Sequence, residues 1–352
     1  MGLDGSVREG HFSYTKLHYE DGAASLKQFL DHVAAGLSVD ASKEDAIAHP
    51  KTLSSMYFYD DKGSEIYQEI TRLREYYPTR TELAILERHG QVIANRFLSN
   101  KQPINLVELG AGDGHKTEVL LQYLIHAGVE FEYFPIDISR KAIEQLLRAK
   151  DQEWLELGLK CHGLVADHME GLRWLRTQRP GVHNVVLFLG SSIGNYDLVN
   201  AEKFLRTLRT ELSPGDNLLV GFDMKKDPHI LQNAYADPHG VTARFNLNLL
   251  ERMNRELGAS FDPDQFFHHA FYNPGLGSME SWLVSKCEQR VYIEALQRDV
   301  MFLAYEGVRT EYSFKYTRKQ IKRLSEAAGL GLVEAFSDEN QWFTDALLVV
   351  KG

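Results

Sequence analysis

The chain has 352 residues, of which 43% are hydrophobic and 25% charged, a balance typical of a globular protein with a large core. Acidic residues outnumber basic ones by 49 to 39, and this formal charge of −10 argues against a nucleic-acid or anionic-membrane surface, which would need clustered lysine and arginine. The two distant cysteines, Cys161 and Cys287, exclude a disulfide framework and a four-cysteine zinc site. With no apolar stretch that could span a bilayer or act as a signal peptide, we expect a cytoplasmic protein with reduced thiols.

The middle of the chain alternates predicted strands and helices. We expect strands at 104–109, 133–138, 163–166, 184–189 and 217–222, and helices around 119–124, over 139–150 and over 200–212. Short apolar strands that alternate with helices are typical of a parallel sheet covered on both faces.

The pattern changes after Met224. The segment 225–314 offers a helix around 247–257 and alternating stretches, 278–293 and 308–314, that predict antiparallel strands. At Thr317 a capping box opens a helix that Gly329 ends, and 332–336 with 342–350 would form a hairpin.

The predicted fold is therefore α/β: a Rossmann-like sheet with an inserted α+β lobe. We expect one domain from residues 81–224 and 315–352, and the lobe from residues 15–80 and 225–314.

A glycine-rich turn follows the first predicted strand, in the order Glu108-Leu109-Gly110-Ala111-Gly112-Asp113-Gly114. Glycines there let the backbone turn tightly and approach a ligand closely. The third glycine falls one position early for a dinucleotide fingerprint, and no Walker loop occurs in the sequence. The acidic-x-G-x-G form resembles motif I of class I methyltransferases, which bind S-adenosylmethionine.

Asp137 and Asp167 end the second and third predicted strands. At this edge of an open α/β sheet a carboxylate can accept ribose hydroxyls, and the next can meet the adenine amino group. The alternative is that both aspartates only cap the helices that follow.

A longer resemblance covers the chain from about Ser54 to Val350. Its motifs are Phe58-Tyr59-Asp60-Asp61-Lys62-Gly63-Ser64, Ile70-Thr71-Arg72-Leu73, Glu75-Tyr76-Tyr77-Pro78-Thr79-Arg80, Phe188-Leu189-Gly190-Ser191-Ser192-Ile193-Gly194-Asn195, the stretch 235–248, and Thr310-Glu311-Tyr312-Ser313. These segments resemble the histidine Nα-methyltransferases, which make the trimethylated histidine betaine from which ergothioneine is built. The resemblance implies that the inserted lobe binds an amino acid.

The resemblance also implies a role for each matching residue. Asn195 and Tyr235 would hold the substrate carboxylate, Gly190 and Asn195 the amine, and Tyr59 and Tyr76 would line the pocket, with Tyr59 and Asn195 closest to catalysis. Glu311 and Ser313 would read the imidazole ring. The implied cofactor site consists of Glu108, Gly110, Gly112, Lys116, Asp137, Asp167 and His168.

Each residue has a structural alternative. Tyrosines usually serve in packing, Asn195 could adopt a turn conformation, and Glu311 with Ser313 could form a solvated strand edge. Ser281 stands where the family typically has an apolar methionine, although Met279 on the same strand face could compensate, and Tyr67 stands where the family often has phenylalanine.

These departures leave three functions open. The first is trimethylation of histidine, the second is Nα-methylation of another aromatic amino acid such as tryptophan, and the third is non-catalytic binding of an amino acid or of S-adenosylmethionine. We expect no metal and no covalent intermediate, and we expect water or a tyrosine and Asn195 network to take the amine proton. No nucleic acid, membrane or obligatory protein partner is indicated.

Overall fold

The computed structural model describes residues 6–17, 22–38, 50–97 and 103–352. The chain divides into two compact units, one from residues 1–19, 78–224 and 316–352, the other from residues 20–77 and 225–315. The expected lobe 15–80 includes residues 18–21 and 39–49, which lie outside the described residues.

The first unit is a nine-stranded sheet in the order β1-β2-β6-β5-β4-β7-β8-β15-β14. The strands from β2 to β8 run parallel to their neighbours, whereas β1, β15 and β14 pair antiparallel. Its elements are β1 (Ser6–Glu9), β2 (Phe12–Lys16), α3 (Tyr77–Phe97, which begins on the last residue of the other unit), β4 (Ile104–Leu109), α4 (His115–His126), β5 (Phe131–Asp137), α5 (Arg140–Glu156), β6 (Lys160–Val165), α6 (His168–Gln178), β7 (His183–Phe188), η3 (Ser192–Asn195), α7 (Leu198–Thr210), β8 (Asn217–Asp223), α10 (Arg318–Ala327), β14 (Leu330–Ser337) and β15 (Phe343–Val350).

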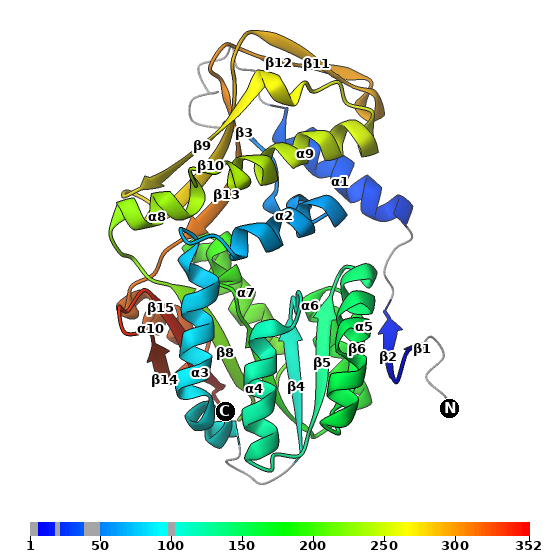
Figure 1. Cartoon of the computed structure of the whole chain (residues 1–352), viewed down its shortest axis with the longest axis vertical. Helices are drawn as coiled ribbons and strands as arrows, with labels where there is room; N and C mark the ends of the chain where they lie inside the picture. The colour runs from blue at the N-terminus through cyan, green and yellow to red at the C-terminus, as the bar shows by residue number, and fades with distance from the viewer. Residues whose placement is uncertain (1–5, 18–21, 39–49, 98–102) are drawn as a thin grey trace. The chain divides into compact units, whose positions relative to one another are not determined.

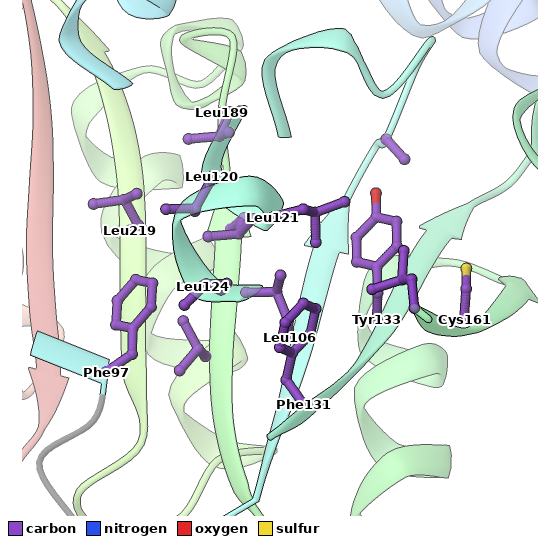
Figure 2. Close-up of a cluster of buried hydrophobic side chains, with 14 of the residues drawn as sticks. Phe97, Leu106, Leu120, Leu121, Leu124, Phe131, Tyr133, Cys161, Leu189 and Leu219 are labelled. Carbon is purple, nitrogen blue, oxygen red and sulfur yellow. The ribbon is translucent and has the colours of Figure 1, made fainter. Parts of the chain in front are cut away.

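Helices cover both faces of this sheet, with α3, α4 and α5 on one face and α6, α7 and α10 on the other (Figure 1). Every residue of β4 and β8 is buried, as expected for strands in the middle of a covered sheet. Figure 2 shows Leu120, Leu121 and Leu124 of α4 close to Leu106 of β4, in the buried core of this unit.

The start of the chain corrects the expected boundary of the lobe. Residues 15–17 were expected in the lobe, yet β2 pairs in parallel with β6, with Ser13 opposite His162 and Lys16 opposite Val165. Phe12 and Tyr14 are buried in the core of the first unit. The edge of β6 has unpaired backbone groups that a further strand satisfies, so the N-terminal hairpin joins the large sheet.

The second unit has a four-stranded sheet in the order β3-β13-β10-β9 and a two-stranded ribbon of β11 and β12. Its core packs α1, α2 and α9 against these strands through residues such as Phe58, Phe245 and Leu283. Its elements are α1 (Gly22–Gly36), β3 (Lys51–Thr52), η2 (Ser55–Phe58), α2 (Asp61–Thr71), α8 (Pro228–Tyr235), α9 (Val241–Leu257), η4 (Pro263–Gln265), β9 (Phe266–Asn273), β10 (Ser278–Ser285), β11 (Gln289–Ile293), η5 (Glu294–Leu296), β12 (Arg298–Phe302) and β13 (Gly307–Phe314).

The Rossmann-like sheet and its alternating helices are confirmed, as are the antiparallel strands of the segment 225–314. The capping box at Thr317 is present, with Gln320 as its partner, and Gly329 adopts a left-handed conformation after α10. The stretch 278–293 forms two strands, β10 and β11, rather than one. Within the described residues, no helix is both long and apolar enough to cross a membrane.

Candidate active site

A left-handed turn joins β4 to α4. Gly110, Gly112 and Gly114 have φ of 76°, 57° and 71°, values that residues with a Cβ rarely adopt. A Cβ on Gly110 or Gly112 would meet no atom within 4 Å. The backbone conformation therefore requires glycine at both positions, and the space beside them lets a ligand approach the main chain closely.

Glu108 supports this turn from inside the unit. Its buried carboxylate accepts hydrogen bonds from Thr117 Oγ1 at 2.5 Å and from the hydroxyl of Tyr133. Burial raises the pKa of Glu108 to about 7. Because both oxygens bind groups of α4 and β5, Glu108 holds the turn in place and orients it.

Asp137 and Asp167 lie where the sequence places them, at the ends of β5 and β6. Asp137 accepts a hydrogen bond from the Ser139 N–H at 2.8 Å, and burial raises its pKa to about 6. Asp167 caps α6 through Oδ1, which accepts from the N–H groups of Met169 and Glu170 at 2.8 and 2.9 Å. The capping alternative thus describes part of what Asp167 does.

His168 begins α6 and packs among aromatic rings. Its centroid lies 5.9 Å from that of Phe188 and 6.2 Å from that of Phe204. Burial lowers the pKa of His168, so the ring is neutral at physiological pH.

Glu82 of α3 is a buried residue that the sequence analysis missed. Its carboxylate accepts from Lys116 Nζ at 2.5 Å and from the Gly190 N–H at 2.8 and 3.0 Å. One side chain therefore connects α3, the first turn of α4 and the turn after β7. Glu82 lies three residues before Ile85 on the apolar face of α3, and a charge on such a face is the signal that could have found it.

Asp345 of β15 lies in the same cluster. It is fully buried, and neither of its carboxylate oxygens has a hydrogen-bond partner among the described residues. Burial and the charge of Glu82 raise the pKa of Asp345 well above its usual range, which favours its protonated form. Glu82 and Lys116 form an ion pair in this cluster.

The turn after β7 holds Gly190 and Asn195. Gly190 and Ser191 both have positive φ, 77° and 57°, and Ser191 Oγ accepts from the Asp223 N–H at 3.0 Å. Asn195 ends η3 with an exposed side chain, one residue after the buried Gly194. A strained turn held by buried hydrogen bonds presents Asn195 at the surface of the first unit.

In the second unit, four of the predicted tyrosines form a connected row. The ring centroids are 5.4 Å apart for Tyr59 and Tyr67, 6.3 Å for Tyr67 and Tyr76, and 6.4 Å for Tyr76 and Tyr235. Desolvation raises the pKa of Tyr59 and Tyr76 well above the usual value, so both remain neutral phenols. Neutral phenols can donate and accept hydrogen bonds without adding charge.

The row ends at three polar residues on strands β10 and β13. Tyr235 Oη lies 2.7 Å from Ser313 Oγ, and Ser281 Oγ donates to Glu311 at 3.4 Å, directly across the two strands. Burial raises the pKa of Glu311 to about 7, while the charge of Lys315 acts in the opposite direction. Seven of the nine predicted substrate residues therefore lie together in this unit: Tyr59, Tyr67, Tyr76, Tyr235, Ser281, Glu311 and Ser313.

The parallel sheet with antiparallel β15 beside its edge, the glycine turn after β4 and the acid that ends β5 define a class I S-adenosylmethionine-dependent methyltransferase. The residues fit this cofactor, because the turn is open to a ligand and Asp137 retains acceptor capacity beyond its single backbone bond.

The particular family follows from comparison with known proteins. The family described as histidine-specific methyltransferase, SAM-dependent, matches residues 29–350. The chain is 39% identical over 291 residues to histidine N-alpha-methyltransferase of Mycobacterium tuberculosis, covering 82% of this chain and 88% of the relative. It is 37% identical over 321 residues to the protein of that name from Mycolicibacterium smegmatis, covering 90% and 94%. Ergothioneine biosynthesis protein 1 of Neurospora crassa is 30% identical over 308 residues, covering 83% of this chain and 32% of that protein. The chain belongs to the histidine-specific, S-adenosylmethionine-dependent methyltransferase family, and the predicted resemblance is confirmed.

We expect the affinity for S-adenosylhomocysteine to fall as the pH drops through about 6. Burial raises the pKa of Asp137 to this value, and the protonated acid loses part of its capacity to accept ribose hydroxyls. Calorimetry between pH 5 and 8 measures the effect. In Asp137→Asn the binding free energy should weaken by about 1.5–3 kcal/mol at pH 8 and lose this pH dependence. A variant that keeps the wild-type profile would remove Asp137 from the cofactor site.

We expect Glu82→Gln to weaken S-adenosylhomocysteine binding by about 1–3 kcal/mol, because Lys116 and the Gly190 turn lose the carboxylate that holds them. The exposed Glu87 on the same helix provides the matched control, Glu87→Gln. Calorimetry and thermal unfolding are measured together. A lowered melting temperature with unchanged affinity would make Glu82 important for folding alone.

Proposed function

We propose that this enzyme transfers methyl groups from S-adenosylmethionine to the α-amino nitrogen of free L-histidine and continues to the trimethyl betaine, a step of ergothioneine biosynthesis. Family membership supports the reaction. The observation that carries the choice of substrate is the pair of Glu311 and Ser313 on one face of β13, beside the row of tyrosines. In this proposal the first unit binds the cofactor and the second binds the amino acid.

A carboxylate and a hydroxyl match the imidazole ring of histidine. The ring has two nitrogens, and in its neutral form one carries a hydrogen and the other accepts one. Glu311 can accept from the N–H, and Ser313 can complement the other nitrogen. The indole of tryptophan has a single N–H and no second nitrogen, so it would leave one of these two groups without a partner, at a cost of about 1–3 kcal/mol.

Ser281 supports a second candidate, another aromatic amino acid. It is buried, smaller than the methionine typical of the family, and hydrogen-bonded to Glu311 at 3.4 Å. Met279 lies opposite Ser313 on the same face of β10 and is also buried, so it supplies apolar surface two residues before Ser281. We infer that Met279 takes over the packing and that Glu311 keeps the pocket selective for imidazole.

The reaction requires alignment more than activation, because the cofactor supplies a methyl group already activated by its sulfonium. Correct positioning of two reactants can contribute about 7–11 kcal/mol. We propose that Asn195 and Tyr235 hold the substrate carboxylate, and that Gly190, Asn195 and Tyr59 orient the amine. Tyr67 and Tyr76 complete the wall of the pocket.

Neutral groups around the amine suit repeated transfer. Tyr59 remains a phenol, since desolvation raises its pKa, so it accepts a hydrogen bond without forming an ion pair. An ammonium held by a carboxylate would keep its proton, whereas an amine held by neutral oxygens releases it to water more easily. We propose water as the final proton acceptor. We also propose that the enzyme works in the cytoplasm without an obligatory protein partner.

Mass spectrometry of the purified enzyme with histidine and S-adenosylmethionine should show a product that carries three added methyl groups. The same assay with tryptophan, tyrosine and phenylalanine tests the second candidate. A product with a single methyl group would reject repeated transfer, and turnover of tryptophan in preference to histidine would reject the assignment of the substrate.

Glu311→Ala should weaken histidine binding by about 1.5–3 kcal/mol, the range for a hydrogen bond to a charged group. The exposed Glu288 of the same unit gives the control Glu288→Ala, for which we expect no change. Calorimetry in the presence of S-adenosylhomocysteine makes the measurement. Equal affinity of the two variants would show that Glu311 does not recognise the ring.

A further inference from the structure

We propose that Lys315 is a positioning residue for recognition of the imidazole ring, which orients the hydroxyls of Tyr235 and Ser313 and adds a positive charge on the side of Glu311. This inference rests on the proposed histidine site and adds a residue that neither the motifs nor the family comparison singled out. All four residues belong to the second unit.

Lys315 is almost completely buried, with 2% of its surface exposed. Its Nζ donates to Tyr235 Oη at 2.9 Å and to Ser313 Oγ at 2.8 Å, and these two oxygens lie 2.7 Å apart. The ammonium also lies 4.6 Å from the centroid of the Tyr235 ring. The three groups form a closed triangle with hydrogen-bond distances on every side.

The triangle limits what the two hydroxyls can offer to a ligand. An ammonium only donates, so Lys315 occupies one acceptor position on each oxygen. The third side of the triangle uses the hydrogen of one hydroxyl. In either direction of that bond, at most one hydrogen of the pair can be donated to a ligand, which suits a ring with one unprotonated nitrogen.

Lys315, the residue that follows β13, also acts on Glu311, which lies four residues earlier in the chain. The groups that face this carboxylate are Ser281 from β10, Tyr59 from the segment after η2, and Lys315 itself. Burial raises the pKa of Glu311 to about 7, and the charge of Lys315 opposes that rise. Without the ammonium the pKa would be higher, and Glu311 would be protonated over more of the neutral range.

The consequence for binding has a definite sign. Protonated Glu311 loses acceptor capacity for the ring N–H, so histidine affinity should fall as the pH decreases through the pKa of Glu311. Removal of the charge at position 315 should move this fall to higher pH. Titration of histidine itself is the same for every variant, so it cancels in the comparison.

The test measures the dissociation constant of histidine against pH for wild type, Lys315→Met and Lys315→Gln, by calorimetry with S-adenosylhomocysteine present. We expect Lys315→Met to weaken histidine binding about tenfold or more at pH 8 and to shift the midpoint of its pH dependence to higher pH. Lys315→Gln still donates to the hydroxyls, so it should show the same shift of the midpoint with a smaller loss of affinity. Turnover of histidine relative to tryptophan should decrease in both variants.

Lys51→Met is the matched control, because Lys51 is equally buried in this unit and pairs with Glu306. It should lower the melting temperature and leave the midpoint unchanged. If histidine affinity in Lys315→Gln has the same pH midpoint as in wild type, the proposal is overturned. This criterion holds even if Lys315→Met does not fold. A wild-type enzyme that fails to bind histidine would instead reject the proposed function, so the two failures are distinguishable.

Discussion

A carboxylate that leaves water keeps its charge only where cations or N–H and O–H donors replace the lost solvent. This constraint determines the chemistry of both units. Glu82 is fully buried and takes three hydrogen bonds, from Lys116 and the Gly190 N–H. Asp345 beside it takes none from the described residues, and its pKa is raised well above the usual range. Asp137 has one backbone donor, and burial raises its pKa to about 6.

A buried carboxylate with too few protein donors to replace its lost water is expected where a ligand supplies the missing hydrogen bonds. Asp137 and Glu311 are both desolvated, and within the described part of the chain each accepts a single hydrogen bond, from the Ser139 N–H and the Ser281 hydroxyl respectively. In contrast, the two hydrogen bonds of Glu108 already satisfy it within the protein. Asp137 and Glu311 therefore have acceptor capacity left for a ligand, whereas Glu108 fixes the glycine turn.

Much of the fold could be predicted because its signals are local. Buried strands such as 104–109 read as short apolar runs, and the Thr317 capping box lies within four residues. Glu108, Asp137 and Asp167 were found because they stand next to predicted strand ends, where α/β sheets bind ligands. The row of tyrosines was found only through the family resemblance. Its members come from the residue after η2, from α2, from the residue before α3 and from α8, and no local pattern joins them.

The parts that were missed depend on contacts between distant residues. The N-terminal hairpin pairs Ser13 with His162, and no periodicity within 6–16 indicates that edge of the sheet. Glu82 and Asp345 meet across more than 250 residues, and each interrupts an otherwise apolar stretch. A charged residue on an apolar helix face or strand is thus a signal that a partner exists, although the sequence does not say which residue it is.

Lys315 illustrates how such a signal can carry information about specificity. Glu311 and Ser313 alternate along one face of β13 and Lys315 follows the strand, and alone this pattern is equally typical of a solvated edge. The structure excludes that alternative for Ser313 and Lys315, because both are buried and hydrogen-bonded to each other. A negative charge near a buried lysine favours the ionised form of both groups. Glu311 is such a charge, since Lys315 opposes the rise of its pKa, and in the histidine site that we propose the two groups would lie beside the imidazole ring.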